Sequence, residues 1–140
     1  MNYKKPSITV DIIIINEKEE FILIKRKNDP FKDYWAIPGG FVDYGETVEN
    51  AAIREAKEET NVSVKLIDII GVYSDFDRDP RGHTISIVFL ASGNMENMKA
   101  NSDAKDINIF SINDLKKTKL AFDHGKILNN GLNLFNKRKA

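Results

Sequence analysis

Three glutamates stand close together in a segment that is expected to be helical. Glu55, Glu58 and Glu59 are three and four positions apart, so an α-helix would place them on one face. They continue the apolar stripe that begins at Val48 and Ala52 instead of opposing it. Acids this close repel one another unless a cation or a partner lies between them. A hard divalent cation such as Mg²⁺, which prefers oxygen ligands, would satisfy this cluster.

The loop before this helix helps to separate two interpretations of the acidic cluster. One alternative is a solvated acidic face whose charge is balanced by Arg54 and Lys57. However, Gly39 and Gly40 follow a short extended piece, and a second turn at residues 43–45 precedes the helix. Glycines allow close backbone approach and leave carbonyl groups free to join a metal site. The combination of glycines and acids favours the metal site.

Residues 40–62 resemble the Nudix box, written Gly-x5-Glu-x7-Arg-Glu-U-x-Glu-Glu-x-Gly-U, where U is apolar. The residues at its fixed positions here are Gly40, Glu46, Arg54, Glu55, Ala56, Glu58, Glu59, Asn61 and Val62. The lead-in at residues 35–40 is also similar to that of the family. Asn61 replaces the last glycine at a place where a left-handed helix C-cap is expected, and Asn is the next best residue there.

The resemblance implies both a fold and a chemistry. Residues 1–140 are expected to form a single domain of the Nudix fold, which is α+β with a mixed β-sheet sandwiched between α-helices. Family members hydrolyse a nucleoside diphosphate linked to another group, with Mg²⁺ or Mn²⁺ as the cofactor. The resemblance implies two or three ions held by Glu55, Glu58 and Glu59, with the Gly39 carbonyl as a further ligand. Such cations neutralise the diphosphate and lower the pKa of the attacking water.

The resemblance also implies residues that assist the reaction. Arg54 would orient the carboxylates, together with Glu46. Family members differ in the base that deprotonates the water, which is either a glutamate of the box or an acid from a later loop. Asp103 and Asp106 are the later-loop candidates in this chain, and the alternative is that both are exposed acids in a polar loop.

A loop over residues 75–83 concentrates arginine, histidine and aspartate beside Pro and Gly. Arg78 and Arg81 can fork onto phosphate oxygens, and His83 can donate to a ribose or a phosphate. The alternative is a salt-bridged surface loop. Arg78–His83 resembles the Arg-Asp-Pro-Arg-Gly-His segment of small ADP-ribose pyrophosphatases, and this implies cleavage of ADP-ribose to AMP and ribose 5-phosphate.

Two other functions remain open from the sequence. The first is a Nudix enzyme for a different substrate, such as an oxidised nucleoside triphosphate or another nucleotide sugar. The second is a non-catalytic sensor that holds ADP-ribose, although the box here retains every carboxylate.

Two more residues are candidates for substrate binding. Arg26 would reach a phosphate or else form a solvated strand end. Trp35 would stack on adenine or else belong to the core with Pro38. His124 is assigned no role.

The elements that position these residues follow from composition and periodicity. Residues 7–16 and 21–25 predict a β-hairpin with its turn at 17–20, and residues 47–60, rich in Ala and Glu, predict a helix. Strands are predicted at 62–73, 84–91 and 107–110, a capped helix start at 111–115 and a terminal helix at 126–136.

Composition excludes several classes of function. The chain has 140 residues, no cysteine and a formal net charge of zero. Disulfides and thiolate chemistry are therefore excluded, and charge gives no case for a nucleic-acid partner. A membrane partner is not expected either, and the polar N-terminus shows no signal peptide. We expect a cytoplasmic protein with a small-molecule nucleoside diphosphate substrate, and the family resemblance implies a homodimer.

Overall fold

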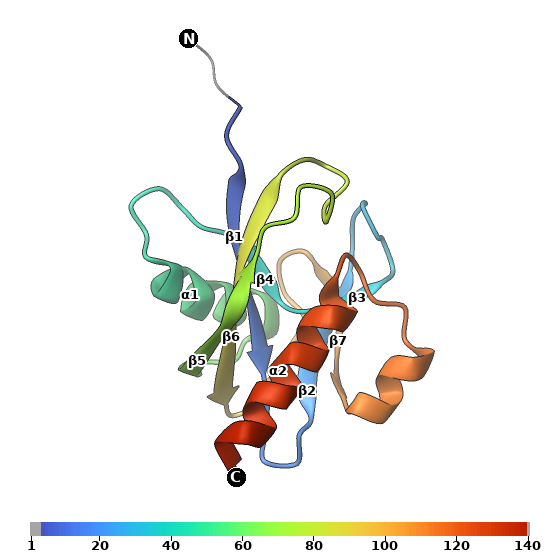
Figure 1. The fold of residues 1–140 in the computed structure, drawn as a ribbon. Coiled ribbons are helices and arrows are strands. Elements are labelled where there is room, and N and C mark those ends of the chain that lie inside the picture. The colour runs from blue at the N-terminus through green and yellow to red at the C-terminus, as the bar shows by residue number, and fades with distance from the viewer. Residues whose placement is uncertain (1–3, 140) are drawn as a thin grey trace.

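The computed structural model describes residues 4–139, which form strands flanked by helices (Figure 1). In chain order the elements are β1 (Ser7–Ile14), β2 (Phe21–Arg26), β3 (Trp35–Ala36), β4 (Gly39–Phe41), α1 (Val48–Thr60), β5 (Val64–Tyr73), β6 (Thr84–Gly93), β7 (Ala104–Phe110), the 3-10 helix η1 (Ile112–Lys117) and α2 (His124–Lys139).

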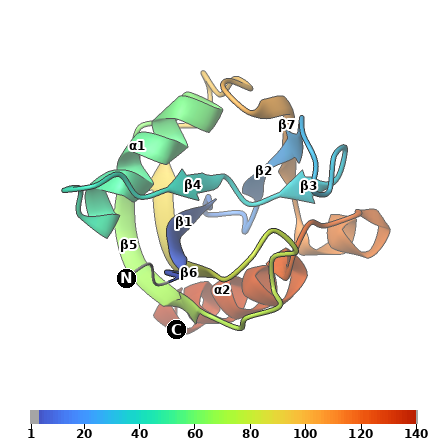
Figure 2. The ribbon, with the colours of Figure 1, turned by 90° about the horizontal axis from the view of Figure 1, so that it is seen from above.

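The strands are divided between two sheets. Four strands follow the order β4-β1-β6-β5, in which β1 and β6 are parallel and the other pairs are antiparallel. The second sheet is antiparallel in the order β3-β2-β7. Helices α1 and α2 lie on opposite sides of the four-stranded sheet (Figure 2). The predicted α+β fold, with a mixed sheet between helices, is confirmed.

The predicted hairpin of the first two strands is wrong. A single bridge between Ile15 and Phe21 joins them, after which β1 pairs with β4 and β6 while β2 pairs with β3 and β7. The physical reason is that β1 is apolar on both faces. Such a strand needs cover on both sides and lies inside a sheet, between two neighbours.

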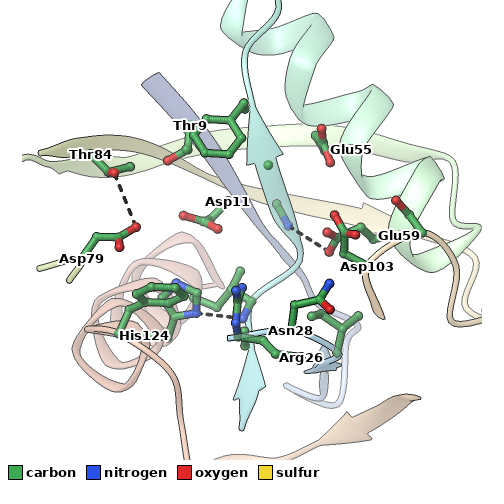
Figure 3. Close-up of a pocket in the computed structure, with 18 of the residues that line it drawn as sticks. Thr9, Asp11, Arg26, Asn28, Glu55, Glu59, Asp79, Thr84, Asp103 and His124 are labelled. Carbon is green, nitrogen blue, oxygen red and sulfur yellow. Dashed lines mark hydrogen bonds between the residues drawn. The ribbon is translucent and has the colours of Figure 1, made fainter. Parts of the chain in front are cut away.

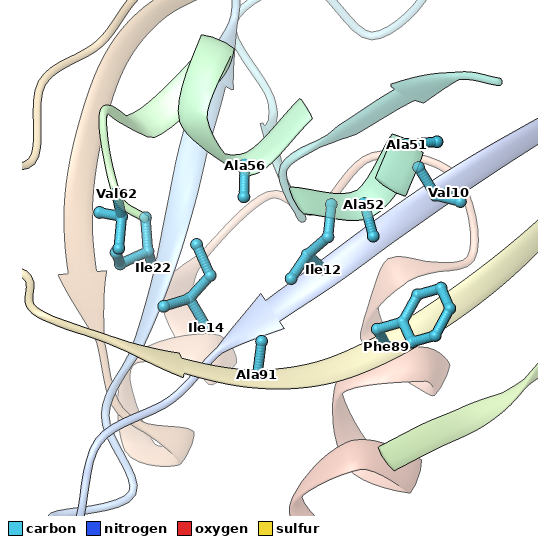
Figure 4. Close-up of a cluster of buried hydrophobic side chains, with 10 residues drawn as sticks. All are labelled: Val10, Ile12, Ile14, Ile22, Ala51, Ala52, Ala56, Val62, Phe89 and Ala91. Atoms are coloured by element: carbon cyan, nitrogen blue, oxygen red, sulfur yellow. The ribbon is translucent and has the colours of Figure 1, made fainter. Parts of the chain in front are cut away.

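The core has two layers, one on each side of β1. Val10, Ile12 and Ile14 pack against α1 (Figure 4). Ile13 and Ile15 point the opposite way and pack in a second cluster with residues of α2. This alternation follows from the two-residue period of a strand, and it fixes which side chains of β1 face each helix.

Helix α1 starts one residue later than predicted, with Thr47 as its N-cap, and ends at the predicted Asn61 cap. The Thr47 side chain accepts from the Asn50 N–H at 3.1 Å at the start of α1. Asn61 ends the helix with φ of 60°, as expected for a left-handed cap. Helix α2 is longer than predicted and starts at His124. Gly131 lies inside it because a Cβ there would press on Ile13 of β1.

None of the helices described between residues 4 and 139 is long and apolar enough to cross a bilayer.

Candidate active site

A cavity of about 380 Å³ lies where β1, β4, α1, the 75–83 loop and the start of α2 meet. Its size is that of a small-molecule site. Predicted site residues from segments far apart in the sequence line this cavity. They are Arg26, Gly39, Glu55, Glu58, Glu59, Arg78, Arg81 and Asp103.

Glu59 is the most buried of the three clustered acids Glu55, Glu58 and Glu59. This residue is only 7% exposed, and its Oε2 accepts a hydrogen bond from the Gly39 N–H at 3.3 Å (Figure 3). Burial, together with the nearby Glu55, Asp11 and Asp103 carboxylates, raises the pKa of Glu59 to about 8. The fold therefore holds a carboxyl group where a negative charge lacks compensation.

Arg54 organises the other acids. Its Nε and Nη2 donate to the two oxygens of Glu46 at 2.7 and 2.9 Å. Its Nη1 donates to Glu55 at 2.8 Å and to Glu58 at 3.1 Å, and Nη2 also donates to the Phe41 carbonyl at 2.9 Å. The Arg54 hydrogen bonds lower the pKa of Glu46 to about 2. This planar group thus sets the orientation of three carboxylates at once.

The acidic face fits a hard divalent cation. A Cβ added to Gly40 would collide with the Glu55 carboxyl group, so this glycine makes room for the acid against the loop backbone. Within residues 4–139 no three acidic or histidine side chains already converge as a metal site. Arg54 instead forms hydrogen bonds with two of the acids, Glu55 and Glu58. Their oxygen donors are those that Mg²⁺ and Mn²⁺ prefer, and the buried Glu59 would exchange its proton for the cation.

Two arginines of the 75–83 loop line the opposite part of the cavity. Arg78 forks onto Asp123 with distances of 2.9 and 2.7 Å, and its side chain is only 6% exposed. Arg81 forks onto Asp79, with the shorter contact at 2.8 Å. Both guanidinium groups are therefore already paired within the protein, and the Arg78 pair links the loop to the start of α2.

Phe122 forms an aromatic wall beside these cations. The guanidinium carbons of Arg26 and Arg81 lie 5.0 and 5.7 Å from the centre of its ring, within cation–π range. Arg26 also donates through Nε to the Pro30 carbonyl at 2.7 Å. Burial, with the nearby Arg81 charge, lowers the pKa of Arg26. The wall gives the cavity a positive side facing the acids of α1.

Besides Arg54 and its partner Glu46, three predicted site residues lie outside the cavity lining. Asp106 extends from β7 and accepts from the N–H of the next residue. The His83 ring bonds to the Ser74 carbonyl at 2.9 Å. Trp35 packs edge-on against Phe110, with ring centres 4.8 Å apart, as in the core alternative.

Asp11 and His124 are buried cavity residues that were not predicted as site residues from the sequence. Asp11 of β1 is 8% exposed and accepts a short hydrogen bond from the Ser86 hydroxyl. His124 is 4% exposed, and its Nδ1 lies 3.0 Å from the Ile37 N–H. Asp11 did carry a signal, because it is the one acid among the β-branched residues of residues 8–15. His124 carried none, because its contact joins residues 87 positions apart.

A comparison with protein families decides how this cavity is classified. The NUDIX domain family matches residues 5–131, which include α1, the loop before it and the acids described above. The chain belongs to the Nudix family. The segment that resembles the Nudix box runs from β4 through α1 to residue 62, and its acids Glu55, Glu58 and Glu59 line the cavity.

Similar Nudix proteins cover most of this chain. An ADP-ribose pyrophosphatase of Methanocaldococcus jannaschii is 52% identical over 90% of this chain and 73% of its own. An ADPR responsive transcriptional repressor, NtrR, of Acinetobacter baylyi is 29% identical over 91% of this chain and 53% of its own. The crystal structure of a MutT/nudix family protein from Enterococcus faecalis has a TM-score of 0.86 at 35% identity, covering 98% of this chain and 64% of that one.

Proposed function

We propose that this Nudix protein hydrolyses ADP-ribose to AMP and ribose 5-phosphate with Mg²⁺ or Mn²⁺. The observation that carries the proposal is the pairing, within one cavity, of the α1 acids with a wall of arginines and Phe122. An ADP-ribose pyrophosphatase that is 52% identical over most of the chain supports the choice of substrate.

In this proposal Glu55, Glu58 and Glu59, with the Gly39 carbonyl, hold two or three ions. A bound ion neutralises the diphosphate and lowers the pKa of the attacking water. Arg54 does not line the cavity, so it acts by orienting the carboxylates.

Proton transfer and substrate contact are assigned to residues that reach the cavity. Asp103 lines it and is close enough to raise the pKa of Glu59, whereas Asp106 lies outside. We therefore assign the later-loop base to Asp103, with a box glutamate as the alternative. Arg26 and Arg81 are assigned to the diphosphate, because they face the acids from the opposite wall and a guanidinium matches phosphate geometry.

A substrate panel tests the proposal. Purified protein with Mg²⁺ is given ADP-ribose, 8-oxo-dGTP, dGTP, NADH and a diadenosine polyphosphate, and kcat/KM is compared between them. ADP-ribose is expected to have the highest value. A higher kcat/KM for a triphosphate would keep the metal site but reject the substrate.

The similarity to an ADPR responsive repressor makes a sensor the second function to be tested. A sensor would bind ADP-ribose in calorimetry and release no product in the panel. The complete set of Nudix box carboxylates in this chain favours turnover.

We further propose that the protein is a cytoplasmic homodimer without nucleic-acid or membrane partners. Ile69 and Val72 of the edge strand β5 and the neighbouring Phe76 are large apolar residues exposed by 48, 60 and 74%, and a second copy would cover such a patch. The absence of cysteine suits a reducing compartment. Light scattering is expected to give twice the 15.9 kDa of one chain; a monomer would contradict this. Cell fractionation tests the compartment.

A further inference from the structure

The cavity extends to both sides of β4, and the acids proposed to hold the metal occupy one side. In Figure 3, Glu55 and Glu59 lie on one side of this strand, while Asp11 and His124 lie on the other. Because the metal site uses neither Asp11 nor His124, this second part of the cavity has a chemistry of its own.

Asp11 supplies a hydrogen-bond acceptor to this part of the cavity. By the alternation of β1 it shares the α2-facing side with Ile13 and Ile15, which are both buried and apolar. The Ser86 hydroxyl donates to Oδ2, and within residues 4–139 no other side chain or N–H donates to this carboxylate. Among the described residues no buried side-chain polar atom lacks a partner, so the free Oδ1 is open to the cavity, where a ligand can donate to it.

His124 supplies a donor. The Ile37 N–H donates to Nδ1 at 3.0 Å, so the proton of a neutral ring is on Nε2. Burial lowers the pKa of His124, which keeps the ring neutral, and the ring lies on the same side of β4 as Asp11 (Figure 3). Among the described residues Nε2 has no acceptor, although it borders the cavity.

We propose that Asp11 and His124 form a subsite for the hydroxyl groups of the terminal ribose of ADP-ribose. This inference rests on the proposed function and adds the residues that select the sugar. A hydroxyl group both donates and accepts. One ribose hydroxyl donates to Asp11 while another accepts from the Nε2–H of His124.

The surroundings of the subsite favour a sugar over the other parts of the substrate. Thr9, Thr84 and Asp79 border the same side of the cavity (Figure 3), and these small polar side chains suit the hydroxyl groups of a sugar. The Asp11 carboxylate, which no cationic side chain pairs with among the described residues, would repel a phosphate placed against it. The Phe122 ring packs against the His124 ring, with ring centres 5.4 Å apart, and therefore borders the subsite on the side of the arginines.

The test compares ADP-ribose with two analogues, one lacking a hydroxyl on the terminal ribose and one with hypoxanthine in place of adenine. The variants are Asp11→Asn and His124→Asn. Asparagine at 124 keeps an acceptor for the Ile37 N–H and lacks the Nε2–H donor. Asparagine at 11 keeps an acceptor for Ser86 and removes the charge. The wild-type enzyme is expected to prefer the intact ribose by about tenfold or more in kcat/KM, because a site built for a hydroxyl rejects an analogue without it.

The variant at the residue that bonds the missing hydroxyl is expected to reduce the preference for the intact ribose toward unity, and both variants are expected to leave the preference for adenine unchanged. An equal loss of kcat/KM for all three compounds would show a merely structural role and overturn the subsite. A change in the adenine preference would place the base there and overturn it as well.

The proposed function can fail separately from the subsite. If the wild-type protein releases no AMP, hydrolysis is rejected, and Kd values for the same three compounds are measured by calorimetry with Ca²⁺. Loss of the ribose preference in these Kd values would still support the subsite, and an unchanged preference would reject it.

Discussion

Glu59 is a carboxyl group that the fold buries beside other acids. Its one hydrogen bond within the described chain is the N–H of Gly39 at 3.3 Å, which is weak compensation for a buried charge. Burial and the neighbouring carboxylates raise its pKa to about 8. The metal-free protein therefore carries a proton at the place where the cation is proposed to bind.

This raised pKa predicts a dependence of stability on pH. The folded state retains the Glu59 proton between about 4.5, the ordinary value, and about 8, whereas the unfolded state has released it. The free energy of unfolding should therefore fall as pH rises through this window, by up to about 1.4 kcal/mol per pH unit. Denaturant unfolding of metal-free protein measures the slope.

Glu59→Gln, which keeps an acceptor for Gly39, is expected to lose this slope. Glu49→Gln, an exposed change on the same helix, should retain it. Equal slopes in the wild type and Glu59→Gln would show that Glu59 is not the titrating group.

A substitution at Arg54 tests whether activity depends on the orientation of the carboxylates as well as on the local charge. Arg54→Lys keeps the positive charge but cannot bond Glu46, Glu55, Glu58 and the Phe41 carbonyl together. We expect kcat/KM to fall about 10–100-fold, with half-saturation at a higher Mg²⁺ concentration. Lys57→Arg on the same helix is the control. An unchanged Mg²⁺ dependence in Arg54→Lys would remove the orienting role.

At the scale of elements, the two helices meet the four-stranded sheet in different ways. Helix α1 packs through alanines against β1 and then presents acids to the cavity. Helix α2 packs through Ile127, Leu128 and Leu132, and Gly131 lets it approach Ile13 closely. Its first residue, His124, reaches the cavity because the helix is held against β1 in this position.

Two glycines of α2 form a matched pair for testing this packing. Gly131→Ala should destabilise the fold by about 1–3 kcal/mol, since the added methyl group presses on Ile13 and Ile70. Gly125→Ala meets only a side-chain carbon of Leu120 at 3.5 Å and should be neutral or stabilising by up to about 1 kcal/mol. Chemical denaturation measures both. A stabilised Gly131→Ala would show that α2 does not pack so closely.

The local elements could be predicted from the sequence, and the pairing of distant ones could not. Helix α1, its Thr47 and Asn61 caps and its acids are all encoded within a few turns. In contrast, β1 and β2 looked like a hairpin because the sequence gives two apolar runs with a turn between them. Their separation into two sheets depends on partners far along the chain, β6 and β7.

At the scale of the whole molecule, the cavity combines segments that local patterns cannot relate. The Nudix box was predictable because its chemistry is contiguous. Asp11, Phe122 and His124 join the site only through strand register and the docking of α2, as the Ile37–His124 contact shows. For the same reason His83 and Trp35, which looked suitable in sequence, lie outside the lining.

The molecule thus places acids, arginines and a small polar subsite around one cavity. The acidic side suits a cation, and the arginine side suits the negative charge of a diphosphate. The central claim is that these two sides act together on ADP-ribose.

Product analysis by chromatography tests that claim most directly. ADP-ribose is incubated with the wild type, with Glu58→Gln/Glu59→Gln and with the surface control Glu49→Gln, in Mg²⁺ and after chelation. The wild type and Glu49→Gln should release equal amounts of AMP and ribose 5-phosphate only with Mg²⁺, while the double variant should be slower by about 10²–10³-fold. AMP release that survives chelation, or a double variant as active as the wild type, would contradict a metal-dependent reaction on the acids of α1.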